Sequence, residues 1–240
     1  MIINNTFISL QNIDFSKGHI LLISKEKGWT SFDVVNKVRY MIRKKLQIKK
    51  IKVGHGGTLD PLASGVLVIG IGSETKNLIE YQNQTKEYVA EITFGAVTAS
   101  YDAETEPFGT FETSHISQKS IEDCLHQHFS GTIHQTPPIY SAKTIDGVRA
   151  YKSAREGKHV EMKTVPVTIY EHEVLNFADN KARIRIACSK GTYIRSIAHD
   201  LGQHLKSGAY LTELKRTKSG PFSATDCLQI QQFESLLTTI

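Results

Sequence analysis

The sequence contains GHGGTLDPLASGVLVIGIG at residues 54–72, which predicts a tight turn followed by a buried strand. In the first part, GHGGTLDP, three glycines in four positions let the backbone turn sharply and approach a ligand closely. The following run, GVLVIGIG at 65–72, is apolar and bounded by glycines, as in a central strand. A structural turn, a phosphate-binding loop and a local cap by Asp60 all fit the first part. Because it lacks the Lys-Ser/Thr pair of a P-loop, the segment in isolation favours a structural turn.

The segments around this stretch alternate between strand-like and helix-like patterns. Strands are expected at residues 18–24, 65–72, 86–95, 166–178, 182–188 and 209–216. Helices are expected at residues 31–47, 73–81, 117–129, 191–205 and 226–237. No repeated βαβ order is present, so the predicted class is α+β with a mixed, mostly antiparallel central sheet flanked by helices. The least regular stretch, residues 131–157, is either a disordered loop or a functional arm.

The composition is that of a globular protein without a membrane anchor. Hydrophobic residues make up 40% of the 240 residues and charged residues 22%, which is ordinary for a soluble domain. No apolar run approaches the roughly 20 residues that a membrane-spanning helix needs, and the N-terminus lacks the pattern of a signal peptide. The three cysteines are far apart, so neither a zinc site nor a disulfide framework is predicted. We therefore expect a cytoplasmic protein without a metal site.

Positive charge is concentrated in one segment. The formal net charge is +5 at pH 7, a modest excess that permits a polyanionic partner without requiring one. Between Lys37 and Lys52, eight of 16 residues are Lys or Arg and none is acidic. A solvated helix face is the usual explanation of such a run. The lack of compensating acids nevertheless favours contact with phosphates.

Further segments, taken together with GHGGTLDP, resemble one known enzyme family in order and spacing. They are KEKGWTS at 25–31, GHGGTLDPLASGVLVIGIGSETK at 54–76, KEY at 86–88, QTPPIYSAKTIDGVRAYKSAREG at 135–157 and GTYIRSIAHDLG at 191–202. This series resembles the TruB family of tRNA pseudouridine synthases over nearly the whole chain. The resemblance implies a pseudouridine synthase fold and isomerisation of a uridine in the T loop of tRNA, at position 55 in tRNA numbering. It also implies one catalytic domain over residues 1–240, with a thumb-like arm at about 131–157 that grips the T arm.

The resemblance assigns roles position by position. Asp60 matches the catalytic aspartate, Tyr88 the tyrosine that stacks on the target base, and Arg195 the arginine that pairs with the aspartate. The residues that match the lining of the nucleotide pocket are His55, Tyr88, Tyr193 and Leu214. The RNA contacts expected are Lys25, Lys143, Arg149 and Arg155. No cofactor and no metal are implied; the expected partner is the T arm of tRNA, bound by a monomer without an obligate protein partner.

Elementary chemistry supports the three catalytic roles. Pseudouridine formation breaks a C–N glycosidic bond and forms a C–C bond after the base rotates, so the detached uracil must be retained. An ionised Asp60 carboxylate can add covalently to base or sugar, and the permanently charged Arg195 would favour its ionised form. Whether C6 or C1′ is attacked first, or a glycal forms, is left open. A flipped-out base needs an aromatic wall, which Tyr88 can supply at roughly 1–3 kcal/mol of stacking, and its hydroxyl can take part in proton transfer.

Each of these residues also has an ordinary structural explanation. Tyr88 in isolation would be a core aromatic on an alternating strand, Arg195 a surface cation on a helix, and His55 a loop histidine.

Two departures from the family pattern add expectations. Lys25-Glu26-Lys27-Gly28 stands where Lys-Pro-x-Gly is usual, so a local change in that turn is expected.

The second departure concerns length. Many relatives carry a C-terminal RNA-binding PUA module, and we expect none in a chain that ends at Ile240. Two other functions were weighed: the catalytic subunit of a guide-RNA particle, like dyskerin, and a non-catalytic tRNA binder or chaperone. The expected lack of a PUA module argues against the first. The presence of Asp60, Tyr88 and Arg195 argues against the second.

Overall fold

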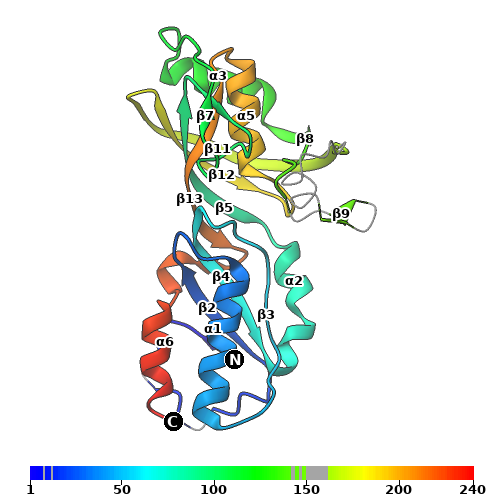
Figure 1. The fold of residues 1–240 in the computed structure, drawn as a ribbon, viewed down its shortest axis with the longest axis vertical. Coiled ribbons are helices and arrows are strands. Elements are labelled where there is room, and N and C mark those ends of the chain that lie inside the picture. Colours follow the sequence, from blue (N-terminus) through cyan, green and yellow to red (C-terminus); the bar gives the residue numbers. More distant parts are fainter. Residues whose placement is uncertain (8, 12, 142–143, 146–147, 150–161) are drawn as a thin grey trace. The chain divides into compact units, whose positions relative to one another are not determined.

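The apolar run after Asp60 forms the strand β4 (Ala63–Ile71) in a computed structural model (Figure 1). The structure describes residues 1–7, 9–11, 13–141, 144–145, 148–149 and 162–240. Among these residues, β4 belongs to a ten-stranded, mostly antiparallel sheet. The hydrogen-bonded order is β1 (Ile2–Ile3), β2 (His19–Lys25), β4, β13 (Ala209–Ser219), β5 (Lys86–Phe94), β12 (Lys181–Cys188), β11 (Val165–Ala178) and β8 (Gly131–Gln135). In addition, β3 (Val53–His55) pairs with β4, and β14 (Phe222–Ser223) pairs with β13.

Short hairpins and helices complete the described part of the chain. The hairpins join β6 (Val97–Thr98) to β7 (Pro107–Phe108) and β9 (Thr144–Ile145) to β10 (Val148–Arg149). The helices are α1 (Ser31–Leu46), α2 (Leu78–Asn83), α3 (Gln118–His128), α5 (Ile194–His204) and α6 (Ile230–Leu237), with the 3₁₀ turns η1 (Gly72–Lys76) and η2 (Ala224–Asp226). Within the described ranges, no helix is long and apolar enough to cross a membrane. The predicted α+β class is confirmed.

The chain divides into two compact units. The first comprises Met1–Tyr88 and Lys215–Ile240, and the second comprises Val89–Leu214. Both boundaries fall inside strands, since Tyr88 lies in β5 and Leu214 in β13. The expectation of one catalytic domain over residues 1–240 is not decided by this division and stays a prediction.

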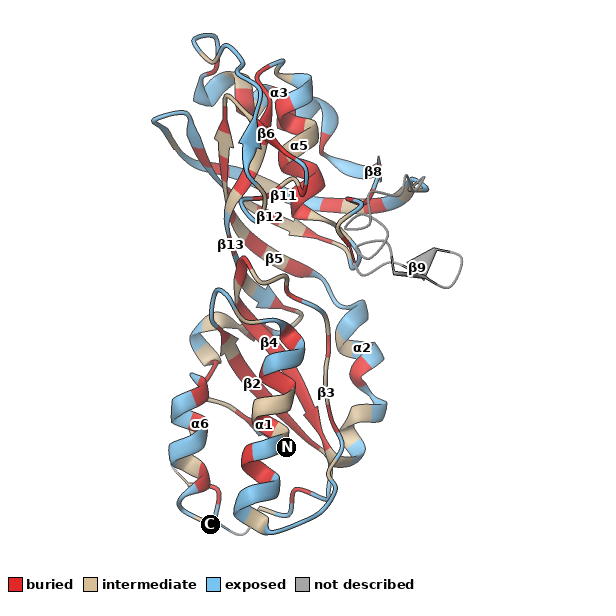
Figure 2. Cartoon of the chain, in the orientation of Figure 1, coloured by how far each residue is buried: buried red, intermediate tan, exposed pale blue. Residues whose placement is uncertain are grey.

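In the first unit, β2 and β4 are buried along nearly their whole length (Figure 2). One face contributes Leu67 and Ile69 to a core that includes residues of α1 and α6, such as Phe233. The opposite face contributes Val66 and Val68 to a second cluster. A strand that is covered on both faces needs apolar residues at successive positions. This requirement explains the uninterrupted apolar run of β4.

In the second unit, strands alternate between the core and the outside. In the part of β5 that belongs to this unit, Ala90, Ile92 and Phe94 are buried while the residues between them are half-buried. In β12, the buried residues are Ala182, Ile184, Ile186 and Cys188. β11 and β12 pair antiparallel, and α3 packs against β11 and α5.

Three predicted helices have different boundaries in the structure, of which α5, expected from residue 191, begins at Ile194. Residues 73–81 form η1 and then α2, because the backbone at Asn77 leaves helical geometry (φ −93°, ψ 0°). The final helix begins at Ile230 rather than near residue 226. Leu228 is instead drawn into bonds with β2: its N–H donates to the Leu22 carbonyl at 3.0 Å, and its carbonyl accepts from the Ser24 N–H at 2.9 Å. Tertiary hydrogen bonds thus displaced a helix start that the local sequence favoured.

Two histidine pairs join α3 to its neighbours in the second unit. The rings of His126 and His172 meet edge to face with centroids 4.8 Å apart, and the rings of His128 and His204 are stacked at 4.0 Å. Burial lowers the pKa of His172, and the adjacent His126 lowers it further. The same two causes, burial and then His128, lower the pKa of His204. Both imidazoles are therefore held in the neutral form near neutral pH.

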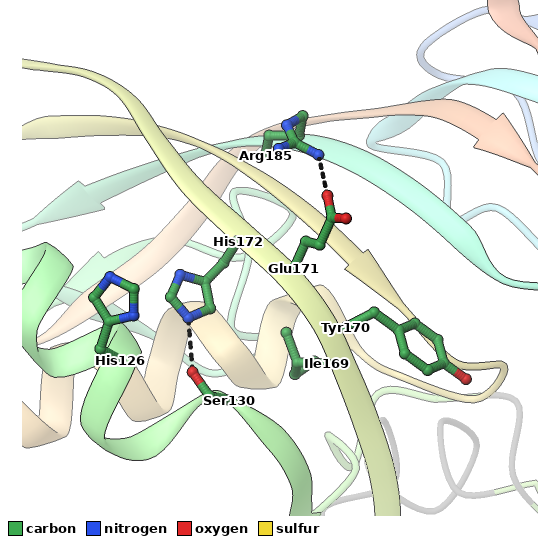
Figure 3. Close-up of a pocket in the computed structure, with 7 residues that line it drawn as sticks. All are labelled: His126, Ser130, Ile169, Tyr170, Glu171, His172 and Arg185. Carbon is green, nitrogen blue, oxygen red and sulfur yellow. Dashed lines mark hydrogen bonds and ion pairs between the residues drawn. The ribbon is translucent and has the colours of Figure 1, made fainter.

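The first of these pairs lines a pocket of about 370 Å³ (Figure 3). Its lining residues are His126, Ser130, Ile169, Tyr170, Glu171, His172 and Arg185. His172 Nε2 lies 2.9 Å from the Ser130 hydroxyl, and the Arg185 guanidinium is bonded to Glu171 at 3.1 Å. No residue expected at the catalytic site lines this pocket. Among the residues described, no group of three or more His, Cys, Asp or Glu side chains is placed to hold a metal ion.

From the two histidine pairs we predict that acid lowers the free energy of unfolding, in part because His172 and His204 become protonated where they pack against α3. A histidine with a lowered pKa in the folded state stabilises the fold above its unfolded pKa, about 6.5, and this stability is lost as the pH falls through the folded pKa. A variant with both His172→Gln and His204→Gln should therefore lose less free energy of unfolding between pH 7.5 and 5.5 than the wild type. Urea denaturation at the two pH values measures this difference.

The control is His134→Gln, which removes an exposed histidine. Asp200, whose pKa is raised by burial to about 6, acts in the opposite direction but is common to all three proteins. An equal loss of stability in the wild type and the double variant would contradict the prediction.

Candidate active site

The segment that carries Asp60 links β3 to β4 and ends in a hydrogen-bonded turn. The Ala63 N–H donates to the Asp60 carbonyl at 3.0 Å, with Pro61 in the second position, where its fixed φ suits a β-turn. The Pro61 carbonyl accepts from the Gly28 N–H at 2.8 Å. The turn is thus bonded internally and also to the loop before α1. Asp60 itself is half-buried.

A buried arginine holds the residues that precede this turn. Arg216, on β13, is only 1% exposed. Its guanidinium donates to the carbonyls of Gly57 and Thr58, each at 3.2 Å, and to the Val66 carbonyl of β4 at 2.7 Å. A buried guanidinium is costly unless its N–H groups find acceptors. The side chain and the turn carbonyls therefore satisfy each other.

Arg216 was not among the residues predicted from the sequence. A signal for it exists, because Arg216 follows Leu214 by two residues in a strand and so shares its inward face. An arginine at an inward position of a strand must find partners inside the protein, so this position predicts a buried, hydrogen-bonded guanidinium.

A serine holds the residue directly before Asp60. Ser31, the first residue of α1, is 2% exposed, and its hydroxyl accepts from the Leu59 N–H at 2.8 Å. The same hydroxyl donates to the Leu59 carbonyl at 3.0 Å. Leu59 is therefore bonded through both of its backbone polar groups, and its side chain is also buried.

Two motif lysines organise neighbouring turns. Lys25 is 1% exposed and donates to the carbonyls of Glu26 and Trp29 at 3.0 and 2.6 Å. Lys86 donates to the carbonyls of Tyr81, Gln82 and Gln84 at the C-terminal end of α2, where a cation also meets the negative end of the helix dipole. Direct contact of Lys25 with RNA would require these bonds to be exchanged. Its role as an RNA contact stays a prediction, and the turn it holds is the one where Glu26 replaces the usual proline.

His55 and Tyr88 also belong to the first unit. His55 lies at the end of β3, half-buried, and burial lowers the pKa of its imidazole, with the charge of Arg216 lowering it further. A neutral imidazole beside the glycine turn can bind a base but adds no charge. Tyr88 is 8% exposed on the inward face of β5. That position fits both a core aromatic and a base-stacking residue, so its role stays a prediction.

Arg195 lies in the second unit, where it is 4% exposed. Its Nη1 donates to the carbonyls of Ser100 at 3.2 Å and Tyr140 at 2.9 Å, and its Nε lies 3.5 Å from a carboxylate oxygen of Asp102. The alternative of a surface cation is therefore wrong. Asp102, which is completely buried, was missed by sequence analysis, because nothing in its neighbourhood of small and polar residues marks it.

The base of the arm is bonded to the start of α5. Gln135, at the end of β8, donates to the Tyr193 carbonyl at 3.0 Å and accepts from the Tyr193 N–H at 2.8 Å. The Ser196 hydroxyl donates to the Thr136 carbonyl at 2.8 Å. The first residues of the expected arm thus form a sheet strand and pack beside Arg195. Lys143 and Arg155 lie outside the described residues, and the backbone of Arg149 lies in β10.

The expected residues are divided between the two units. His55, Asp60 and Tyr88 belong to the first unit, as do Arg216 and Ser31. Tyr193 and Arg195 lie with Asp102 in the second, as does Leu214, which is 9% exposed on β13. The pairing of Asp60 with Arg195 stays a prediction.

Comparisons with known proteins cover nearly the whole chain. Residues 43–194 match the model of the TruB family pseudouridylate synthase N-terminal domain, and residues 195–239 match that of the tRNA pseudouridylate synthase B C-terminal domain. A protein of Phocaeicola vulgatus named tRNA pseudouridine synthase B is 48% identical over 94% of this chain and 95% of its own length. A protein of the same name from Flavobacterium johnsoniae is 45% identical over 93% of this chain and 98% of its own length.

The fold has a similar solved structure. A chain of a Cbf5–Nop10–Gar1 complex superposes with a TM-score of 0.68 at 28% identity over 92% of this chain. The match covers 54% of that chain, so the present protein spans about half the length of this solved relative.

Proposed function

Because the chain belongs to the TruB family of pseudouridylate synthases, we propose that it isomerises a uridine in the T loop of tRNA, at position 55 in tRNA numbering. Relatives that share nearly half of its residues over almost their whole length bear the name tRNA pseudouridine synthase B. The observation that carries the proposal is the Asp60 segment, whose backbone is bonded from Gly57 to Pro61. Such a segment can present a carboxylate in one fixed direction.

In the proposed reaction, the Asp60 carboxylate is the nucleophile on a flipped-out uridine. The C1′–N1 bond breaks, the uracil rotates, and a C1′–C5 bond forms. One proton leaves C5 and one is gained at N1, so the product has the composition of the substrate and no oxidant or reductant is needed. Attack at C6, attack at C1′ and a glycal route all satisfy this balance. We therefore propose that the reaction needs no cofactor.

The other residues have distinct roles in this proposal. Tyr88 stacks on the target base, and its hydroxyl can serve in the proton transfer from C5. Arg195 favours the ionised form of Asp60, and the bonds to Ser100, Tyr140 and Asp102 fix its guanidinium. The residues that line the nucleotide pocket are His55, Tyr193 and Leu214.

Docking of the tRNA is proposed to use the basic segment at 37–52 and the arm at about 131–157, with Lys143, Arg149 and Arg155 as contacts. Near the end of the basic segment, a pocket of about 660 Å³ is lined by the three lysines Lys50, Lys52 and Lys76, by one acid, Asp14, and by apolar residues such as Ile48 and Ile51. Lys50 and Lys52 are exposed. Exposed cations that outnumber the acids around them are suited to phosphate contact.

We further propose that the protein acts as a cytoplasmic monomer with one catalytic domain and without an obligate protein partner. The solved relative of 28% identity is part of a complex with Nop10 and Gar1. The relatives that match over almost their whole length favour a guide-free enzyme over a particle subunit.

Asp60→Asn should abolish pseudouridine formation and leave RNA binding within about threefold of the wild type. The amide keeps the size of the side chain but removes the negative charge that makes it a nucleophile. The measurement is incubation with an unmodified T-arm stem-loop, followed by carbodiimide mapping of pseudouridine, with affinity from filter binding.

Asp123→Asn is the matched control, since it makes the same change on an exposed carboxylate of α3 and should leave turnover unchanged. Turnover in Asp60→Asn near that of the wild type would refute the nucleophile. A product at a uridine outside the T loop would correct the substrate.

A variant with Lys50→Gln and Lys52→Gln should bind tRNA more weakly and with a smaller dependence on salt. Each phosphate contact contributes roughly 0.7–0.9 to the slope of log K against log[salt], so the slope should decrease by about 1.5. The control is Lys119→Gln with Lys181→Gln, which removes the same charge from lysines that are already paired with Asp123 and Glu91. An equal change of slope in both variants would show that net charge, not this pocket, is responsible.

A further inference from the structure

Two neighbouring hydroxyls at the start of α1 serve different parts of the protein. Thr30 caps the helix: its hydroxyl accepts from the Asp33 N–H at 3.0 Å, and its own N–H donates to the Asp33 carboxylate at 2.9 Å. This reciprocal arrangement satisfies the helix end. The Ser31 hydroxyl takes no part in it and bonds instead to Leu59, 28 residues further along the chain.

From this division we infer that Ser31 is a positioning residue for Asp60, an inference that rests on the proposed function. A serine hydroxyl has one proton to donate and lone pairs to accept. Ser31 uses both capacities on a single residue, donating to the Leu59 carbonyl and accepting from the Leu59 N–H. The two bonds restrain the peptide units on both sides of the Leu59 Cα, whereas a single bond would leave one of these units free to rotate.

The position of Leu59 makes this restraint relevant to the chemistry. Leu59 directly precedes Asp60, so the ψ angle of Leu59 and the φ angle of Asp60 set the direction in which the carboxylate leaves the backbone. On one side, Arg216 holds the carbonyls of Gly57 and Thr58. On the other side, the turn bond from Ala63 holds the carbonyl of Asp60. Ser31 supplies the restraint between these two.

The burial of the site explains why water does not replace the hydroxyl. Ser31 is 2% exposed and Leu59 is 3% exposed. Removal of the hydroxyl leaves two backbone groups without their partner in a place that solvent reaches poorly. The peptide unit can then relax only by rotating, and a displacement of about 1 Å in a reacting group can cost on the order of 100-fold in rate.

The test compares Ser31→Ala with Thr30→Ala in the full-length protein. Ser31→Ala should lower the single-turnover rate of pseudouridine formation by about 10- to 100-fold, with the dissociation constant for T-arm RNA within about twofold of the wild type. Thr30→Ala removes the helix cap and should lower the melting temperature at least as much. Its single-turnover rate should stay within about threefold of the wild type. All rates are measured well below the melting temperature of the least stable variant.

A second measurement reports directly on the hydrogen bond between Ser31 and the Leu59 amide. Hydrogen–deuterium exchange of the Leu59 amide should accelerate at least about tenfold in Ser31→Ala, because its acceptor is lost. The same amide should be unaffected in Thr30→Ala. This measurement does not depend on catalysis.

Several outcomes would overturn the inference. An unchanged single-turnover rate in Ser31→Ala would do so, as would a loss of rate that follows melting temperature equally in both variants. A wild type that makes no pseudouridine would instead refute the proposed function. In that case, unaltered exchange of Leu59 in Ser31→Ala would refute the positioning of the segment as well, and faster exchange would support it.

Discussion

The segment that carries Asp60 depends on the buried guanidinium of Arg216. Three backbone carbonyls, two in the glycine turn and one in β4, accept from this one side chain. Its approach requires Gly65, because a Cβ at that position would lie 2.2 Å from the Arg216 carbonyl oxygen, and the φ angle there is +101°. Gly65 in β4 and Arg216 in β13 therefore depend on each other: the glycine permits the close approach of the strand that carries the arginine. Without either, the carbonyls of Gly57, Thr58 and Val66 would lose the donor that Arg216 supplies.

Buried cations bonded to carbonyls recur in both units. Lys25 holds the loop before α1, Lys86 holds the end of α2, and Arg195 holds the carbonyls of Ser100 and Tyr140. Turns have carbonyls that no helix or strand satisfies, and a long cationic side chain can reach several of them from the core. Such bonds stabilise irregular backbone without adding secondary structure. The turn that carries Asp60 and the segments at Ser100 and Tyr140 can therefore be irregular and still be held in place, which is what a site with fixed geometry needs.

Local pattern predicted the elements better than their ends. The continuous apolar run of β4 and the alternation in β5 and β12 follow from burial on two faces or on one, and both were predicted from sequence. The starts of α5 and α6 were predicted too early. Gly191 has a φ of +79°, which ends the turn before α5, and Leu228 bonds to β2. Before α5 the backbone is thus outside the helical region, and before α6 the backbone groups of Leu228 are bonded to β2 instead of to a helix.

The sequence by itself determined the fold class, the core strands and the candidate residues Asp60, Tyr88 and Arg195, since motif spacing and hydrophobic periodicity are local properties. Only the tertiary structure decided which side chains hold them. Ser31 and Leu59 are 28 residues apart, and Arg216 lies 158 residues from Thr58. Similarly, only the structure shows that Lys25 and Arg195 are buried, with 1% and 4% of their surface exposed. The donors and acceptors of a buried turn come from wherever the fold brings a side chain, and no spacing along the chain encodes that encounter.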